Sequence, residues 1–239
     1  MYTNDYNRDN YNLSPQSQAA LTNTVSSAMK RVYFKMTLAL IVTALTALWA
    51  STSQSYTNFL IGHRWLMWVL VIAELGLVFT ISGAINKLSS AAATGLFYLF
   101  AVVNGLMLCT IFWVYSPAAI TKTFFITAGT FGAMSVYGYF TTNDLSKFGS
   151  FLFMALIGLI IASVVNIFLH SSTLDWIVSI AGVLIFIGLT AWDTQQIKTM
   201  AMTMPADSVG KLATVGALSL YLYFINLFLY LLRIFGNRD

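Results

Sequence analysis

The sequence predicts an all-α membrane protein of seven transmembrane helices, with the seventh helix central in the bundle. Of its 239 residues, 58% are hydrophobic and only 8% are charged, whereas about a quarter of the residues of a soluble domain carry a charge. The second observation is a series of apolar runs, each close to the roughly 20 residues that a helix needs to cross the hydrocarbon core. The third is a stripe of polar residues along the last run.

The apolar runs are separated by short polar segments. We expect helices from about residue 36 to 51 and at 65–85, 92–115, 123–140, 149–169, 176–194 and 213–235. Residues 1–29 are polar and have no apolar core of the signal-peptide type. They predict a mobile N-terminal tail, so that residues 30–239 form the seven-helix transmembrane domain.

Basic residues are divided unevenly between the two sides that seven crossings would define. With the N-terminus inside, eight Lys and Arg lie on the inner side and four on the outer side, and basic residues concentrate in cytoplasmic loops. We therefore expect a cytoplasmic N-terminus. The same rule accounts for the net charge of +4, so we expect a lipid bilayer and no nucleic acid as partner. A re-entrant last helix would also place Arg233 and Arg238 inside.

The run at 213–235 has one polar side. Its polar residues follow one another at steps of four, three, four and three, which places them on a single face of a helix. A helix of this kind belongs inside a bundle, with the polar face toward other helices or water. The stripe is either part of an ion path or a set of hydrogen bonds between helices. It consists of Ser219, Tyr223, Asn226, Tyr230 and Arg233.

Two of the eight acidic residues lie within apolar runs. Glu74 is in the middle of the second run, and Asp193 is toward the cytoplasmic end of the sixth. A charge at the bilayer centre costs about 2.5–3.5 kcal/mol, so the side chain of Glu74 should face the interior. Glu74 is either an ion or proton site or a protonated acid bonded to a neighbouring helix. Asp193 either pairs with a base, binds a cation or senses pH, or it forms a simple helix-end salt bridge with Lys198 or Lys87.

The common catalytic patterns are missing from the chain. There is no His-Glu-x-x-His, no Gly-x-Ser-x-Gly and no Walker loop. The single cysteine, Cys109, excludes an intramolecular disulfide and a cysteine metal cluster. His63 and His170 stand far apart, near the ends of apolar runs. We therefore expect no enzymatic activity, and no cofactor other than a bound cation.

Three segments carry a resemblance to a known family. They are LTAWDTQQIK at 189–198, GALSLYLYFINLFLYLLRIFG at 216–236 and FGAMSVYGYFTTNDLSKFGSFLFMALIGLIIASVVN at 131–166. Together they resemble the bacterial branch of the Bax inhibitor-1 family, also called the transmembrane Bax inhibitor motif family, over about residues 30–236. The resemblance implies a seven-helix bundle around the seventh helix and a pH-sensitive calcium leak channel in the bacterial inner membrane. The alternative that it implies is a regulatory membrane protein that does not transport and modulates a membrane-bound AAA protease.

The pH sensor that the resemblance implies is a pair of aspartates in the sixth and seventh helices. Asp193 matches the first aspartate. Tyr223 stands at the second, because the family pattern LYLDFINLF reads LYLYFINLF here. Glu74 matches an acid that some bacterial members carry in the second helix. The basic latch after that helix has Ile85 at the expected position, with Lys87 two residues later.

A tyrosine in place of the second aspartate should weaken calcium binding, because a hard cation prefers several oxygen ligands. The Tyr223 hydroxyl is expected to donate a hydrogen bond to Asp193 and favour its ionised form. We expect Asn226 to belong to the same ion-binding or pH-sensing group. Gating charges or charge pairs are expected at Lys87, Lys198 and Arg233.

Overall fold

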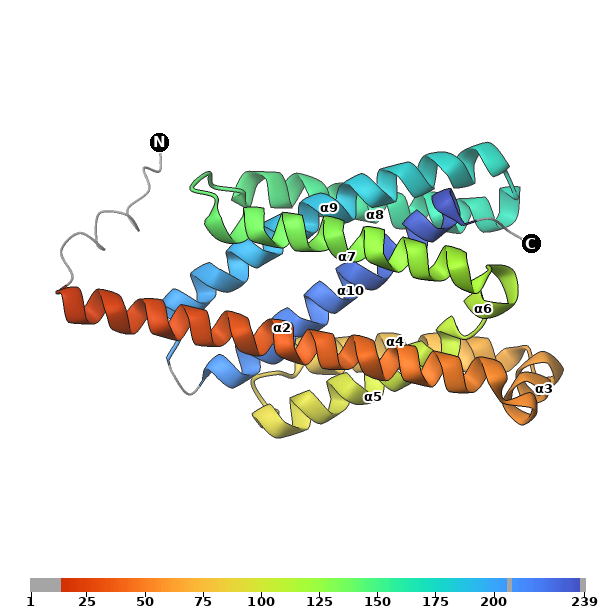
Figure 1. Cartoon of the computed structure of the whole chain (residues 1–239), viewed down its shortest axis with the longest axis horizontal. Coiled ribbons are helices and arrows are strands. Elements are labelled where there is room, and N and C mark those ends of the chain that lie inside the picture. Colours follow the sequence, from red (N-terminus) through yellow and green to blue (C-terminus); the bar gives the residue numbers. More distant parts are fainter. Residues whose placement is uncertain (1–13, 206–207, 237–239) are drawn as a thin grey trace.

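The computed structural model describes residues 14–205 and 208–236, which fold into one bundle of helices (Figure 1). The helices in the described part of the chain are α2 (Pro15–Thr52), α3 (Gln54–Gly62), α4 (Trp65–Gly83), α5 (Ser90–Leu108), α6 (Ile111–Val114), α7 (Pro117–Phe140), α8 (Ser146–Leu169), α9 (Ser172–Thr203) and α10 (Val209–Phe235).

The first helix begins well before the predicted boundary at residue 29. The Oγ of Ser14 accepts a hydrogen bond from the N–H of Ser17 at 3.2 Å, and Pro15 occupies the first helical position, where its missing N–H costs nothing. Val25 and Met29 are buried against the bundle. Residues 15–29 therefore belong to α2, and the rest of the predicted tail, residues 1–13, lies outside the described residues.

Other helix boundaries also differ from the sequence prediction, and α7 begins at Pro117 rather than at residue 123. The sixth predicted span continues nine residues beyond 194 and ends at Thr203, so the connection to α10 is short. The run at 92–115 is interrupted after Leu108, and the short helix α6 follows. Pro117 does end that run as predicted, but it also starts α7 directly, because proline suits the first position of a helix and Ser116 caps it.

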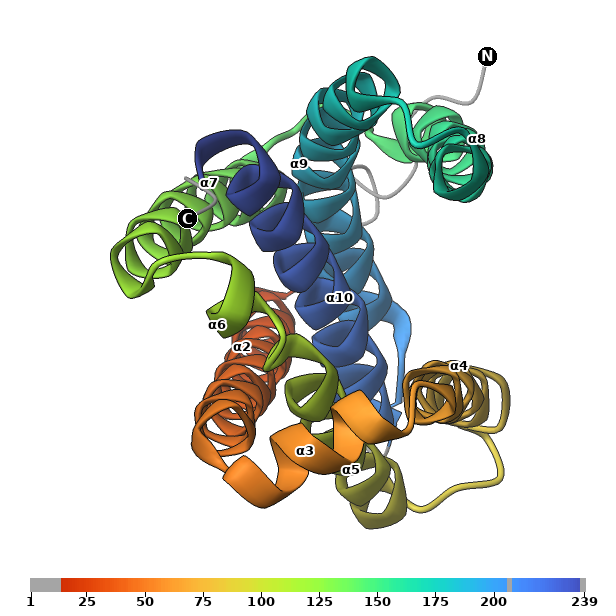
Figure 2. The same ribbon diagram turned by 90° about the vertical axis from the view of Figure 1, so that its right-hand side faces the viewer.

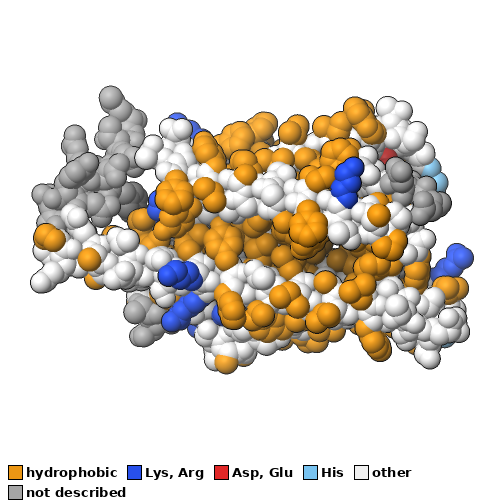
Figure 3. All heavy atoms as spheres, in the orientation of Figure 1, with side chains coloured by type: hydrophobic (Ala, Val, Ile, Leu, Met, Phe, Trp, Pro, Cys, Tyr) orange, Lys and Arg blue, Asp and Glu red, His pale blue; other side chains and the backbone are white. Residues whose placement is uncertain are grey.

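The long helices run between two ends of the bundle (Figure 1). The start of α2 and the α4–α5, α7–α8 and α9–α10 connections lie at one end, which we call the basic end because Lys147, Lys198 and Lys211 lie there. Helices α3 and α6 and the α8–α9 connection lie at the opposite end. Figure 3 shows hydrophobic side chains over much of the middle of one face, as lipid contact requires.

Six helices among the described residues are long and apolar enough to cross a membrane: α2, α4, the α5–α6 segment, α8, α9 and α10. Helix α7 has 24 residues and runs beside them between the same two ends. A seventh crossing fits this arrangement and stays a prediction.

Helix α10 contacts α9, α2, α7, α5 and α4, and the end view shows it between these helices (Figure 2). Its buried residues are mostly apolar, whereas four of the five stripe residues are half-buried and Arg233 is exposed. Elsewhere the helices approach closely at small residues. A Cβ added to Gly105 would lie 2.7 Å from the carbonyl oxygen of Thr43, so α5 and α2 are in backbone contact there.

The orientation of the bundle is open to a direct test through Lys147. This side chain is exposed in the first turn of α8, and the native Cys109 is buried. Because the basic end should face the cytoplasm, Lys147→Cys should react with an impermeant maleimide only after intact cells are permeabilised. Ser172→Cys, exposed at the opposite end, should react without permeabilisation. Labelling of Lys147→Cys in intact cells would show that the basic end faces outward, opposite to the predicted orientation.

Candidate functional site

Asp193 lies on α9 and is buried, and its Oδ2 atom has no hydrogen-bond partner among the described residues. Buried carboxylate oxygens almost always have a donor, because the loss of water is otherwise uncompensated. The side chain lines a pocket of about 210 Å³ between the α4–α5 turn, α9 and the start of α10. Asn86, Ser208, Lys211 and Ser219 supply the other polar groups of this lining.

Lys198, one of the two charge partners that the sequence suggested for Asp193, makes its contacts elsewhere. The Nζ of Lys198 donates to the carbonyl oxygen of Tyr139 at 2.7 Å and lies 5.0 Å from the centre of that ring. Neither Lys198 nor Lys87 forms a salt bridge with Asp193 in the part of the chain that the structure describes. The acid is therefore not the member of a helix-end ion pair that the sequence left open.

Arg233 does form a charge pair, but at the opposite end of the bundle. Its Nη1 lies 3.4 Å from the Oδ1 of Asp175 at the start of α9, with both side chains partly exposed. Such a pair contributes little to stability in contact with water. It joins the last turn of α10 to the first turn of α9.

Lys211 is the basic residue that lines the Asp193 pocket. Its Nζ donates to the carbonyl oxygen of Asn86 at 3.2 Å, across the connection between α4 and α5. The sequence analysis counted this lysine only toward the charge of the inner side. Its spacing from Asp193 gives no sign of proximity, because the two residues lie on different helices.

Tyr223 is half-buried and packs beside Phe186 of α9, with 6.0 Å between ring centres. Its phenol lies near Asp193. The described contacts include no hydrogen bond between the two residues, so the expected donation from Tyr223 to Asp193 is not seen. The tyrosine is a neighbour of the acid without being its partner.

The polar stripe of α10 is divided among several neighbours. Ser219 faces the Asp193 pocket, whereas Asn226 lines a second pocket. The Nδ2 of Asn226 donates to the carbonyl oxygen of Leu222 in its own helix at 2.8 Å. Tyr230 stacks on Phe186. The structure therefore does not bring Asn226 and Asp193 together in one pocket.

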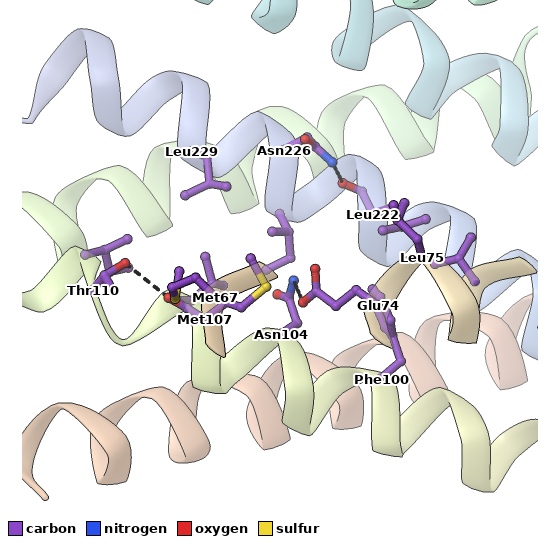
Figure 4. A pocket seen from close by; sticks show the side chains of 14 residues that line it. Met67, Glu74, Leu75, Phe100, Asn104, Met107, Thr110, Leu222, Asn226 and Leu229 are labelled. Carbon is purple, nitrogen blue, oxygen red and sulfur yellow. Dashed lines mark hydrogen bonds between the residues drawn. The ribbon is translucent and has the colours of Figure 1, made fainter. Parts of the chain in front are cut away.

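The second pocket has a volume of about 400 Å³ and lies between α4, α5 and α10. Glu74 faces it, and Figure 4 shows the carboxylate directed toward Asn104 of α5. The Nδ2 of Asn104 lies 2.8 Å from the Oε1 of Glu74, and its Oδ1 lies 2.9 Å from the hydroxyl of Tyr221. That hydroxyl is 2.6 Å from the Oγ1 of Thr43 on α2. One line of contacts thus crosses four helices.

Sequence reasoning missed Asn104 and Tyr221. Tyr221 is fully buried, with its ring edge-on to Phe97 and Phe100 at 5.8 and 5.5 Å. Both missed residues are uncharged polar groups in the middle of apolar runs, and that was the available signal. The search for charges and for an i, i+4 stripe passed over them.

Lys35 forms a third polar cluster near the basic end. Its Nζ donates to the hydroxyls of Thr94 and Thr214 at 2.8 and 2.7 Å and to the carbonyl oxygen of Gly210 at 3.3 Å. These contacts join α2, α5 and α10. The sequence analysis treated Lys35 only as part of the inner-side charge.

Neither pocket has the composition of a tight metal site. The described residues contain no group of three or more His, Cys, Asp and Glu side chains that could hold a metal ion. A calcium ion in the Asp193 pocket would meet one carboxylate, together with neutral oxygens such as those of Ser219 and Asn86. This donor set suits a passing ion better than a resident one, because calcium sites use six to eight oxygens and gain affinity from charged ligands.

Comparison with known proteins gives a consistent result over most of the chain. The family described as "Inhibitor of apoptosis-promoting Bax1" matches residues 25–239. Inner membrane protein YbhL of Escherichia coli is 50% identical over 213 residues, which cover 88% of this chain and 91% of that protein. An uncharacterized protein of Borreliella burgdorferi is 46% identical over 212 residues, with the same coverage of both chains. One from Deinococcus radiodurans is 38% identical over 224 residues, covering 93% and 96%.

Proposed function

The chain belongs to the Bax inhibitor-1 family of multi-pass membrane proteins, and from this premise we propose that it is a pH-sensitive cation leak across the bacterial inner membrane, with calcium or protons passing Asp193. The proposal includes seven spans, a central α10 and a cytoplasmic N-terminus.

The observation that carries the proposal is the Oδ2 atom of Asp193, which is buried without a hydrogen-bond partner in the described structure. A carboxylate in this state gains free energy from a proton or a cation, since either supplies the compensation that the protein does not. The adjoining pocket offers room for the ion. Lys211, held by Asn86 in the same lining, would oppose the entry of cations and limit the rate of the leak.

Tyr223 determines how the leak should respond to pH. Two acids facing each other in a low-dielectric site would share a proton near neutral pH and act as a steep switch. A phenol titrates near 10 and cannot replace the second acid at neutral pH. The native protein should therefore bind calcium weakly and change its leak rate only gradually with pH.

Asp193→Asn tests the proposal in purified protein reconstituted into liposomes. Removal of the charge should lower calcium flux about tenfold, which corresponds to the loss of an interaction of about 1.4 kcal/mol, and should abolish the pH response. Asp144→Asn is the matched control. Asp144 is exposed in the α7–α8 turn, where the N–H of Ser146 holds its pKa below the ordinary value, and its loss should leave flux unchanged.

Equal flux through the native protein and Asp193→Asn would exclude Asp193 as the ion site. A native protein that moves neither calcium nor protons would favour the regulatory function, in which the chain acts by binding a membrane partner.

Tyr223→Asp tests the altered sensor position. The new carboxylate should raise calcium affinity and steepen the pH dependence of the leak between about pH 6 and 8, because two neighbouring acids then compete for one proton. Tyr223→Asn removes the phenol without adding a charge and serves as the control. If Tyr223→Asp and Tyr223→Asn have the same pH profile, the two-acid mechanism does not apply to this chain.

A further inference from the structure

The contacts that lead from Glu74 to α2 form a continuous series of hydrogen bonds, and this series requires a definite number of hydrogen atoms. Four links follow one another, from Glu74 to Asn104 at 2.8 Å, to Tyr221 at 2.9 Å, to Thr43 at 2.6 Å and to the carbonyl oxygen of Ala101 at 2.9 Å. Each link needs one hydrogen atom. The two hydroxyls, of Tyr221 and Thr43, carry one hydrogen each.

An ionised Glu74 leaves this chain one hydrogen short. A carboxylate only accepts, so the NH₂ group of Asn104 must face it and the Oδ1 of Asn104 must face Tyr221. Tyr221 then donates to Asn104, and Thr43 must supply the hydrogen of its 2.6 Å contact with Tyr221. No hydrogen remains for the 2.9 Å contact between Thr43 and Ala101.

A protonated Glu74 supplies every link. The acid donates to the Oδ1 of Asn104, whose NH₂ group now faces Tyr221. Tyr221 donates to Thr43, and Thr43 donates to the carbonyl oxygen of Ala101. This arrangement requires only that the amide oxygen and nitrogen of Asn104 exchange places, which heavy-atom geometry does not distinguish.

We propose that Glu74 is a proton-binding site that is occupied at neutral pH, and that loss of its proton reverses the direction of the hydrogen bonds from Glu74 to Thr43. The proton is the ligand, and the amide of Asn104 is the group that turns over when the proton leaves. Tyr221 and Thr43 carry the change from α4 across α10 to α2.

The surroundings of Glu74 favour the neutral acid. The lining of its pocket contains no Lys, Arg, His or Asp side chain, so no nearby cation stabilises a carboxylate. Helices α5 and α10 make the main contacts with α4. The other polar groups of the pocket lining are all uncharged: Asn104 of α5, Thr110 of the α5–α6 connection and Asn226 of α10; Tyr221 of α10 contacts Asn104. An ionised acid here bears the cost of a charge in the membrane interior with one amide in compensation.

This site is separate from the proposed leak. Glu74 and Asp193 line different pockets that share no lining residue. The proton of Glu74 would set which residue donates in the hydrogen bonds between α2, α5 and α10, whether or not an ion passes Asp193. Failure of the leak proposal therefore leaves this inference standing, and the reverse also holds.

The composition of the chain allows a specific experiment, because Glu74 is its sole glutamate. Cell-free synthesis with glutamate labelled at the side-chain carboxyl carbon gives one NMR signal, whose chemical shift separates the acid from the carboxylate. Loss of this signal in Glu74→Gln confirms its assignment. In native protein in lipid nanodiscs, the signal should be that of the neutral acid at neutral pH. A carboxylate signal at neutral pH would overturn the proposal.

The role of the hydrogen-bond series from Glu74 to Ala101 is tested by Tyr221→Phe. This variant keeps the ring and removes the hydroxyl in the middle of the series. In the variant, the hydrogen bonds from Tyr221 to Asn104 and to Thr43 are lost. With Glu74 neutral, this is a loss of two bonds. With Glu74 ionised, the net loss is one bond, because the Thr43 hydroxyl is then free to donate to the carbonyl oxygen of Ala101. The ratio of protonated to ionised Glu74 should fall about fivefold, as one hydrogen bond implies. Tyr223→Phe, outside the chain, should leave the ratio unchanged. An equal ratio in native protein and Tyr221→Phe would show that the proton of Glu74 is not coupled to these hydrogen bonds, and would overturn the proposed reversal.

Discussion

The hydroxyl of Tyr221 makes the hydrogen bonds on which the packing of α10 against α2 and α5 depends. It lies 2.6 Å from Thr43 and 2.9 Å from Asn104, so it joins α10 to α2 and α5 at a point from which lipid is excluded. Helices in a bilayer gain little from the hydrophobic effect when they associate, and close packing and hydrogen bonds take its place. The orientation of Asn104, and through it of Glu74, follows from this hydroxyl.

Polar contacts join α10 to its neighbours at three heights. Lys35 reaches Thr214 near the basic end, Tyr221 lies in the middle, and Arg233 meets Asp175 at the opposite end. Four buried side-chain atoms of the described residues have no hydrogen-bond partner, and the Oδ2 of Asp193 is the one that belongs to an acid; the others are the hydroxyls of Thr123 and Ser135 and the indole N–H of Trp192. Polar groups that a fold leaves without compensation concentrate where proteins bind ligands, which is why the leak is proposed at Asp193.

Apolar runs were sufficient to predict the existence of the long helices, because segments of about 20 apolar residues have few alternatives in a membrane. They did not predict the short helices α3 and α6. The position of the polar interior was not predictable in the same way. Tyr221 and Tyr223 are two residues apart and point to different sides of α10, and the sequence around them does not show which one meets a partner. The stripe analysis selected Tyr223, because it lies in register with Ser219 and Asn226. The partners of Tyr221 come from other helices, and only the assembled bundle reveals them.

The central claim is that the hydrogen bond between Thr43 and Tyr221 holds α2 against α10, and a double-mutant cycle measures it most directly. Thr43→Val and Tyr221→Phe each remove one hydroxyl and nearly keep the shape of the side chain. Unfolding free energies of the native protein, both single variants and the double variant should give a coupling energy of at least about 0.6 kcal/mol, the average found for hydrogen bonds between membrane helices, and at most about 1.7 kcal/mol, the maximum found. Single effects that add to within about 0.3 kcal/mol would contradict the account.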